Sequence, residues 1–282
     1  RIAVIMMPNK SEDISLLVGD FMVFQHLMKD GNTEAAISLS EEILLRSRSI
    51  SERDHVCEAR IRMERALLGA IDEGDIGKEL RWCVDRFNAS IPYSSLHGIA
   101  LLNLASWHTN KNELLMSLAT HAEISTDLGH PGEIFGLSRL ESARILVSME
   151  DYEPAMRHMW MARLEFSKSS MIPESLVSNL EWLDMALDDV DAESPRMKYR
   201  IENAKPREKP GNTRITSNPE DIKLVVEDII SLTFQDLSGY DRTDIGLIID
   251  ASDILSLPAW KNILMERIEE IQDSRVLDVL QS

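Results

Sequence analysis

The sequence predicts an all-α protein built from antiparallel helix hairpins that stack side by side. Three observations favour this fold class. Leu, Ile, Ala, Met and Glu dominate the composition and aromatic residues make up only 5% of it, which suits helices better than sheets. Apolar residues recur with helical spacing from about residue 15 to about residue 189. Breaks of two to five polar or Gly-containing residues separate the periodic stretches, the length expected between antiparallel helices.

Four helix pairs and one further helix follow each other along the chain. The expected pairs are 16–30 with 34–47, 52–70 with 76–87, 94–107 with 113–129, and 132–150 with 151–169. A ninth helix follows Pro173 and spans 174–190. Because an amphipathic helix must cover its apolar stripe with another element, we expect each pair to pack against the next.

The second helices of the four pairs carry a repeating position, occupied by Ala36, Leu80, Leu115 and Ala155. The separations are 44, 35 and 40 residues. The best match to a repeat motif is DYEPAMRHMWMARLEF in the fourth pair. The expected turn and close-packing positions are Gly31, Ala36 and Ile43 in the first pair, Leu80, Val84 and Phe87 in the second, Leu115, Ala119 and Ala122 in the third, and Tyr152, Ala155 and Ala162 in the fourth.

This pattern resembles tetratricopeptide (TPR-like) repeats, particularly the longer variety of about 40 residues. The resemblance covers roughly residues 15–190 and implies a right-handed superhelix, an α-solenoid of stacked antiparallel hairpins. The second pair departs most from the pattern, because Leu80, Val84 and Phe87 replace small residues. The alternative is an irregular helical bundle without a true repeat.

A basic, proline-containing segment follows the repeats. Between residues 194 and 219 there are four prolines and seven basic residues against two acidic ones, so a continuous helix is not expected there. The segment is either a solvated linker or an electrostatic clasp on an acidic face of this chain or of a partner. Six of these seven basic residues are the candidate contact residues: Arg196, Lys198, Arg200, Lys205, Arg207 and Lys209.

These patterns divide the chain into four parts. We expect an N-terminal extension over 1–14, a TPR-like repeat domain over 15–190, the basic linker over 191–219 and a small C-terminal helical unit over 220–282. Asn218 and Pro219, followed by acidic residues, are typical of a helix start. Whether the C-terminal unit docks on the repeats stays open at this level.

The chain is strongly acidic, with a formal net charge of −18. Such a surface repels nucleic acid and the anionic cytoplasmic leaflet, so neither is an expected partner. It favours protein partners that are basic or have basic segments, and self-association into a homo-oligomer stays open. The two cysteines do not make a disulfide framework, which indicates a reducing, cytoplasmic location.

Motifs for catalysis or cofactor binding do not emerge from the sequence. There is no GxxxxGK[ST], HExxH or CxxC motif, and the seven His are dispersed. The acidic loops at Asp72 and Asp188 lack the spacing of a calcium-binding loop. We therefore expect no enzyme, no cofactor, no metal and no catalytic residue. A helical hydrolase with a site drawn from scattered residues is the remaining enzymatic alternative.

The resemblance implies that the first helix of each pair lines a concave, partner-binding face. The candidate groove residues are Phe21, Gln25 and Lys29 in the first pair, Arg62 and Arg65 in the second, His97, Trp107 and His108 in the third, and Leu140 and Arg144 in the fourth. Trp107 is the expected anchor, because an indole on a groove wall often carries binding energy. Alternatively, Trp107 is packed between two helices of the repeat.

The function that these observations predict is a non-enzymatic protein-interaction scaffold or adaptor, which binds a peptide or helix of a partner in the concave face. A second hypothesis is a regulator that senses a ligand or peptide and whose effector domain lies outside this chain. A small molecule that stabilises the native state would favour the second hypothesis.

Overall fold

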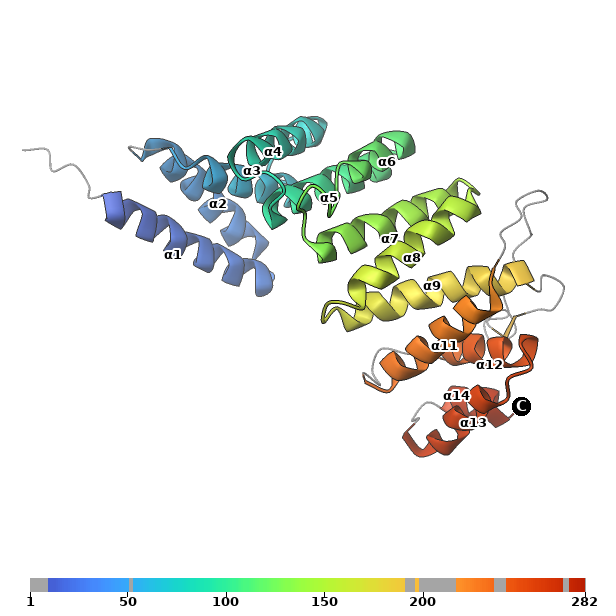
Figure 1. Ribbon diagram of the computed structural model, residues 1–282. Helices are drawn as coiled ribbons and strands as arrows, with labels where there is room; N and C mark the ends of the chain where they lie inside the picture. Colours follow the sequence, from blue (N-terminus) through green and yellow to red (C-terminus); the bar gives the residue numbers. More distant parts are fainter. Residues whose placement is uncertain are drawn as a thin grey trace, which may run out of the picture. The chain divides into compact units, whose positions relative to one another are not determined.

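The computed structural model describes residues 10–50, 53–190, 196–197, 217–235, 242–270 and 274–281. Within these ranges the secondary structure is helical and contains no strand, so the predicted all-α class is confirmed (Figure 1). The chain forms two compact units, which comprise Arg1–Ile134 and Phe135–Ser282. We call them unit 1 and unit 2.

Unit 1 consists of helices that pack against their neighbours in chain order (blue to green in Figure 1). The helices are α1 (Lys10–Lys29), α2 (Thr33–Ser49), α3 (His55–Leu67), α4 (Ile76–Ser90), α5 (Ser95–Asn110) and α6 (Leu114–Ala122), with a short 3-10 helix at Glu73–Asp75. Packing joins α1 to α2, α3 to α4 and α5 to α6, and also α2 to α3 and α4 to α5. This is the arrangement of successive stacked hairpins that the sequence predicted.

Short polar side chains start several of these helices. Asn32 accepts a hydrogen bond from the Ala35 amide, and Ser94 accepts one from the His97 amide. Asp54 accepts from the amides of Val56 and Cys57 at the start of α3. These bonds satisfy amides that have no partner inside the helix, and they define where each helix begins.

Most of the predicted packing positions lie in the core. Ala36, Phe87 and Ala155 are fully buried, and Leu80 is nearly so. The prediction was wrong in α6, where Leu115, Ala119 and Ala122 are exposed. The buried residues of that helix are Ser117, Thr120 and His121.

Hydrogen bonding to the backbone explains this difference in α6. The Ser117 hydroxyl donates to the Ala105 carbonyl at 2.8 Å, and Thr120 donates to the carbonyl of Met116 at 2.9 Å. A hydrogen-bonded hydroxyl can be buried at little cost, and small side chains allow the two helices to approach closely.

A buried carboxylate ties α3 to the end of α2. The Glu58 side chain is fully buried and lies 2.9 Å from Arg48 and 2.7 Å from Arg53. Burial alone would raise the pKa of Glu58, but the hydrogen bonds and charges of Arg53 and Arg48 outweigh it and lower the pKa from 4.5 to about 2. Glu58 is therefore ionised and paired at neutral pH.

Unit 2 contains the fourth predicted pair and the ninth predicted helix, and it continues with helices beyond the predicted repeats. It comprises α7 (Gly132–Ser148), whose first residues precede the unit boundary, α8 (Tyr152–Phe166), α9 (Ile172–Val190), α11 (Pro219–Thr233), α12 (Arg242–Ile254), α13 (Ala259–Glu266) and α14 (Ser274–Gln281). Helix α9 packs against α8, α11 and α12, while α13 and α14 pack on α12. The C-terminal helices thus dock directly on α9, which answers the question that the sequence left open.

Two described residues of the basic linker, Arg196 and Met197, are buried. Arg196 is 2% exposed; its guanidinium donates to the Leu187 carbonyl and lies 3.4 Å from the Asp188 carboxylate at the end of α9. The adjacent Met197 amide donates to the Asp250 carboxylate of α12 at 2.8 Å. These two residues thus join α9 to α12. The predicted domain limits themselves stay a prediction.

Candidate functional site

A groove in unit 1 brings together the first helices of three successive hairpins. Its volume is about 260 Å³, somewhat below the roughly 300–1,000 Å³ of pockets that enclose whole small molecules. The lining residues come from α1, from the start of α3 and from α5. They are Leu17, Val18, Phe21, Met22, Gln25, Asp54, Val56, Cys57, Arg60 and Leu96.

Helix α1 supplies the apolar wall of this groove. Leu17, Phe21 and Phe24 are buried toward the core of unit 1. By contrast, Val18 is 58% exposed and Met22 is 65% exposed. Because Val18 and Met22 are four residues apart, they share one face of the helix. Helix α1 therefore has an apolar groove face in addition to its core face.

Arg60 supplies the positive charge of the groove. Its guanidinium carbon lies 4.4 Å from the centre of the Phe21 ring, a cation–π contact that holds the side chain against the groove wall. Within the described ranges Arg60 forms no ion pair. The other charged lining residue, Asp54, already accepts two amide hydrogen bonds at the start of α3. A carboxylate brought by a partner would therefore find a positioned cation in Arg60.

Cys57 is also part of the groove, but its thiol is not reactive. Burial raises its pKa to about 11, and Asp54 contributes in the same direction. The thiol is thus protonated at neutral pH and a poor nucleophile or metal ligand.

The predicted groove residues of α1 fall at or beside this site. Phe21 and Gln25 line the groove, and Lys29 is exposed in the last turn of α1. The two predicted arginines of α3 face other helices instead. Arg62 pairs with Glu79 and lies 3.7 Å over the Trp82 ring of α4, while Arg65 donates to Ser40 of α2 at 2.9 Å.

The predicted residues of α5 are mostly packed. Trp107 is partly buried, and its ring lies against Gly77 of α4 so closely that a β-carbon there would come within 2.5 Å. The structure thus places this indole between helices, and it does not line the groove. His108 is 9% exposed and lies 2.6 Å from the Glu113 carboxylate.

His97 belongs to a buried pair of histidines. His97 and His130 are 5% and 3% exposed, their rings stack, and Nδ1 of His97 lies 3.2 Å from Nε2 of His130. Nδ1 of His97 also accepts from the Tyr93 amide at 3.3 Å, so this nitrogen carries no proton in the structure. Burial lowers the pKa of His97, and the nearby His130 lowers it further.

In unit 2, Leu140 packs in a core cluster with Ala162 and Phe166, and Arg144 pairs with Glu181 and Glu141, each at 2.6 Å. Of the predicted basic-linker residues, Arg196 is buried as described above. The others lie outside the described residues: Lys198, Arg200, Lys205, Arg207 and Lys209.

Sequence reasoning missed several groove residues, namely Val18, Met22, Arg60 and Leu96. A helical wheel of α1 could have found Val18 and Met22, because they share the face of Gln25 and Lys29 rather than that of the buried phenylalanines. No local signal marks Arg60. Its role depends on the contact with Phe21 from another helix.

The described residues form neither a candidate metal site nor a candidate membrane-spanning helix. No group of three or more His, Cys, Asp or Glu residues there could hold a metal ion. None of the described helices is long and apolar enough to cross a lipid bilayer.

Comparison with solved structures identifies the fold. No family model matches the chain, and no curated protein matches it. A kinesin-light-chain-like protein of Podosopora anserina, composed of nearly identical TPR-like repeats, is 12% identical with a TM-score of 0.50, and the match covers 81% of this chain and 98% of that chain. BtubC (BKLC) from P. vanneervenii is 11% identical, and the match covers 94% of this chain and 89% of that chain. Its TM-score of 0.37 is too low to support a conclusion about the fold. The chain has the TPR-like helical-repeat fold, as the repeat pattern predicted.

Proposed function

We propose that this protein is a non-enzymatic scaffold or adaptor that binds an apolar peptide or helix of a protein partner in the groove of unit 1. The observation that carries the proposal is the convergence of α1, α3 and α5 on one groove whose apolar residues Val18 and Met22 are more than half exposed. Exposed apolar residues gathered in a groove favour a binding surface. The TPR-like fold supports the same function.

The chemistry of the groove favours a particular kind of segment. Two or three apolar side chains would cover Val18, Met22 and Leu96, and an acidic group would pair with Arg60 above the Phe21 ring. Elsewhere on the partner, basic segments would complement the net charge of −18. The cavity of about 260 Å³ has room for a few anchoring side chains of the partner.

A pair of matched substitutions tests this proposal. Met22→Glu places a charge in the groove, whereas Leu115→Glu places the same charge on α6, where Leu115 is 71% exposed and outside the groove. Both side chains are largely in solvent, so neither variant should unfold the protein. The partner is isolated by photo-crosslinking from position 22 in the native cell, and its affinity for each purified variant is then measured.

We expect Met22→Glu to weaken binding at least tenfold, because one buried anchor is worth roughly 1.4 kcal/mol or more. Leu115→Glu should bind as the wild type does. Arg60→Gln should weaken binding several-fold, and more so at low salt. The proposal fails if Met22→Glu binds as tightly as Leu115→Glu.

A further inference from the structure

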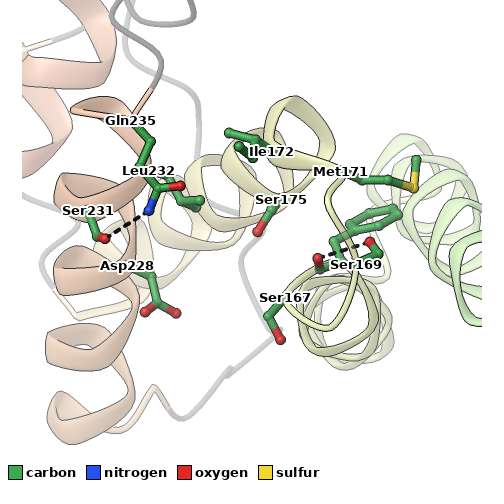
Figure 2. A pocket seen from close by; sticks show the side chains of 10 residues that line it. Ser167, Ser169, Met171, Ile172, Ser175, Asp228, Ser231, Leu232 and Gln235 are labelled. Carbon is green, nitrogen blue, oxygen red and sulfur yellow. Dashed lines mark hydrogen bonds between the residues drawn. The ribbon is translucent and has the colours of Figure 1, made fainter.

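Unit 2 contains a second, polar pocket that is separate from the groove. It lies between the turn that joins α8 to α9 and the helix α11, and its volume is about 230 Å³ (Figure 2). Its walls carry four serine hydroxyls, an amide and a carboxylate beside a few apolar side chains. The lining residues are Phe166, Ser167, Ser169, Met171, Ile172, Ser175, Asp228, Ser231, Leu232 and Gln235.

A buried arginine positions the carboxylate of this pocket. Arg163 is 5% exposed, lies 4.4 Å over the Trp160 ring and donates to Asn179 at 2.6 Å. Its second nitrogen donates to Oδ2 of Asp228, also at 2.6 Å. The other oxygen, Oδ1, accepts no hydrogen bond from the described residues. Asp228 is therefore held in place while keeping an open acceptor, and the Arg163–Asp228 pair leaves the pocket electrically neutral.

Ser175 adds a further hydroxyl to the pocket. The residue is 4% exposed, and its hydroxyl makes no hydrogen bond within the described part of the chain. Figure 2 shows this hydroxyl turned into the pocket from α9, with Asp228 on the α11 wall. Its oxygen is not among the buried, unpartnered side-chain atoms of the described residues, since it opens on the pocket. A ligand in the pocket would replace water as its hydrogen-bond partner.

The remaining hydroxyls define what the ligand must offer. Ser167 and Ser169 donate to the carbonyls of Leu164 and Phe166, at 2.9 Å and 3.1 Å, so each hydroxyl oxygen can still accept. Ser175, by contrast, can donate. A polyhydroxy compound meets this requirement at several points, since each hydroxyl both donates and accepts.

Charge and size narrow the class further. Asp228 is the charged residue among those that line the pocket, and its open oxygen disfavours an anion. The volume of about 230 Å³ lies below the roughly 300–1,000 Å³ of pockets that enclose drug-sized ligands, so only a small molecule fits. We propose that this pocket binds a small neutral polyhydroxy compound of monosaccharide size, held by Ser175, Asp228 and the neighbouring serine hydroxyls. This site is independent of the groove in unit 1.

The test uses the full chain with glucose, galactose, mannose, ribose and myo-inositol as probes, and with lysine and inorganic phosphate as charged comparisons. Binding is measured by titration calorimetry and by the rise in melting temperature. Ser175→Ala removes the unpartnered hydroxyl, and Ser231→Phe fills the pocket from the exposed side of α11. Ser148→Ala is the control, because Ser148 lies on α7 and does not line the pocket.

We expect at least one sugar or inositol to bind saturably and to raise the melting temperature. Ser175→Ala should weaken that binding about fivefold, the effect of losing one neutral hydrogen bond. Ser231→Phe should abolish it, and Ser148→Ala should leave it unchanged. A stabilisation that rises without saturation and equally in all variants, as excluded osmolytes produce, would overturn the proposal. So would saturable binding of lysine or phosphate in place of the neutral probes.

Discussion

Replacing Gly77 with alanine should destabilise unit 1, because Gly77 forms the contact surface for Trp107. A β-carbon at Gly77 would lie 2.5, 2.6 and 2.7 Å from three carbons of the indole ring. Carbon atoms in contact normally lie about 3.5–4.0 Å apart, so the overlap is about 1 Å. The indole is rigid and its ring carbons are part of the helix contact. Either the ring or the whole of α4 must therefore move.

The expected magnitude follows from two opposing effects. Overpacking a close contact costs about 1–3 kcal/mol. Alanine in place of glycine favours the helix by up to about 1 kcal/mol, and by less in the first turn, where Gly77 lies. The net loss should be about 1–2 kcal/mol, which corresponds to roughly 3–8 °C in melting temperature for a unit of this size. Urea denaturation followed by far-UV circular dichroism measures the free energy of unfolding directly.

Two controls separate this contact from the general effect of glycine replacement. Gly19 lies within α1, and a β-carbon there would meet no atom within 4 Å. Gly19→Ala should therefore be neutral or stabilise the protein by up to about 1 kcal/mol. Combining Gly77→Ala with Trp107→Leu should recover part of the loss, since the smaller side chain leaves room for the new methyl group. If Gly77→Ala behaves as Gly19→Ala does, the packing of Trp107 on α4 is not as described.

Three titratable side chains give further predictions. The pKa of Glu58 is lowered from 4.5 to about 2. Its contribution of about 3 kcal/mol to the free energy of unfolding is therefore present above pH 4.5 and is lost as the pH falls toward 2. In urea denaturation, Glu58→Gln should be less stable than the wild type at pH 7 and nearly equal to it at pH 2. Burial lowers the pKa of His97 below 6.5, so the free energy of unfolding should fall as the pH drops below 6.5, and His97→Gln should flatten that dependence. Burial, followed by the charges of Arg139 and Arg157, lowers the pKa of His158 from 6.5 to about 4; stability should therefore also be lost as the pH falls from 6.5 to 4, and an unchanged slope in His158→Phe would contradict this.

Local sequence patterns predicted the helices and most of their packing positions correctly. Ala36, Leu80 and Ala155 were expected in the core, and all three are buried. Helical periodicity and short polar breaks are local properties, so they can be read without knowing which helices meet. The error in α6 has a specific cause. Hydrophobicity favoured Leu115, whereas the contact depends on a hydroxyl of Ser117 that bonds to a carbonyl of α5.

The candidate sites were harder to predict, because they depend on residues from several helices. Phe21 and Gln25 were predicted from the repeat pattern to bind a partner; both line the pocket of unit 1, and their role in binding stays a prediction. His97 and Leu140 were expected to face a partner, but they lie buried among other side chains. Their periodicity could not distinguish a groove-facing position from one that meets the next helix, since both fall on the same half of the helix.

The sequence alone determined the helical-repeat fold, the order of its helices and the acidic character of the chain, because composition and periodicity act along the chain itself. Only the tertiary structure decided that Arg60 lies over Phe21 and that Ser175 faces Asp228 across a pocket. It alone showed that α11 and α12 pack on α9. Each of these contacts joins residues far apart in sequence, and the distance between such residues depends on how side-chain volumes fill the space between helices.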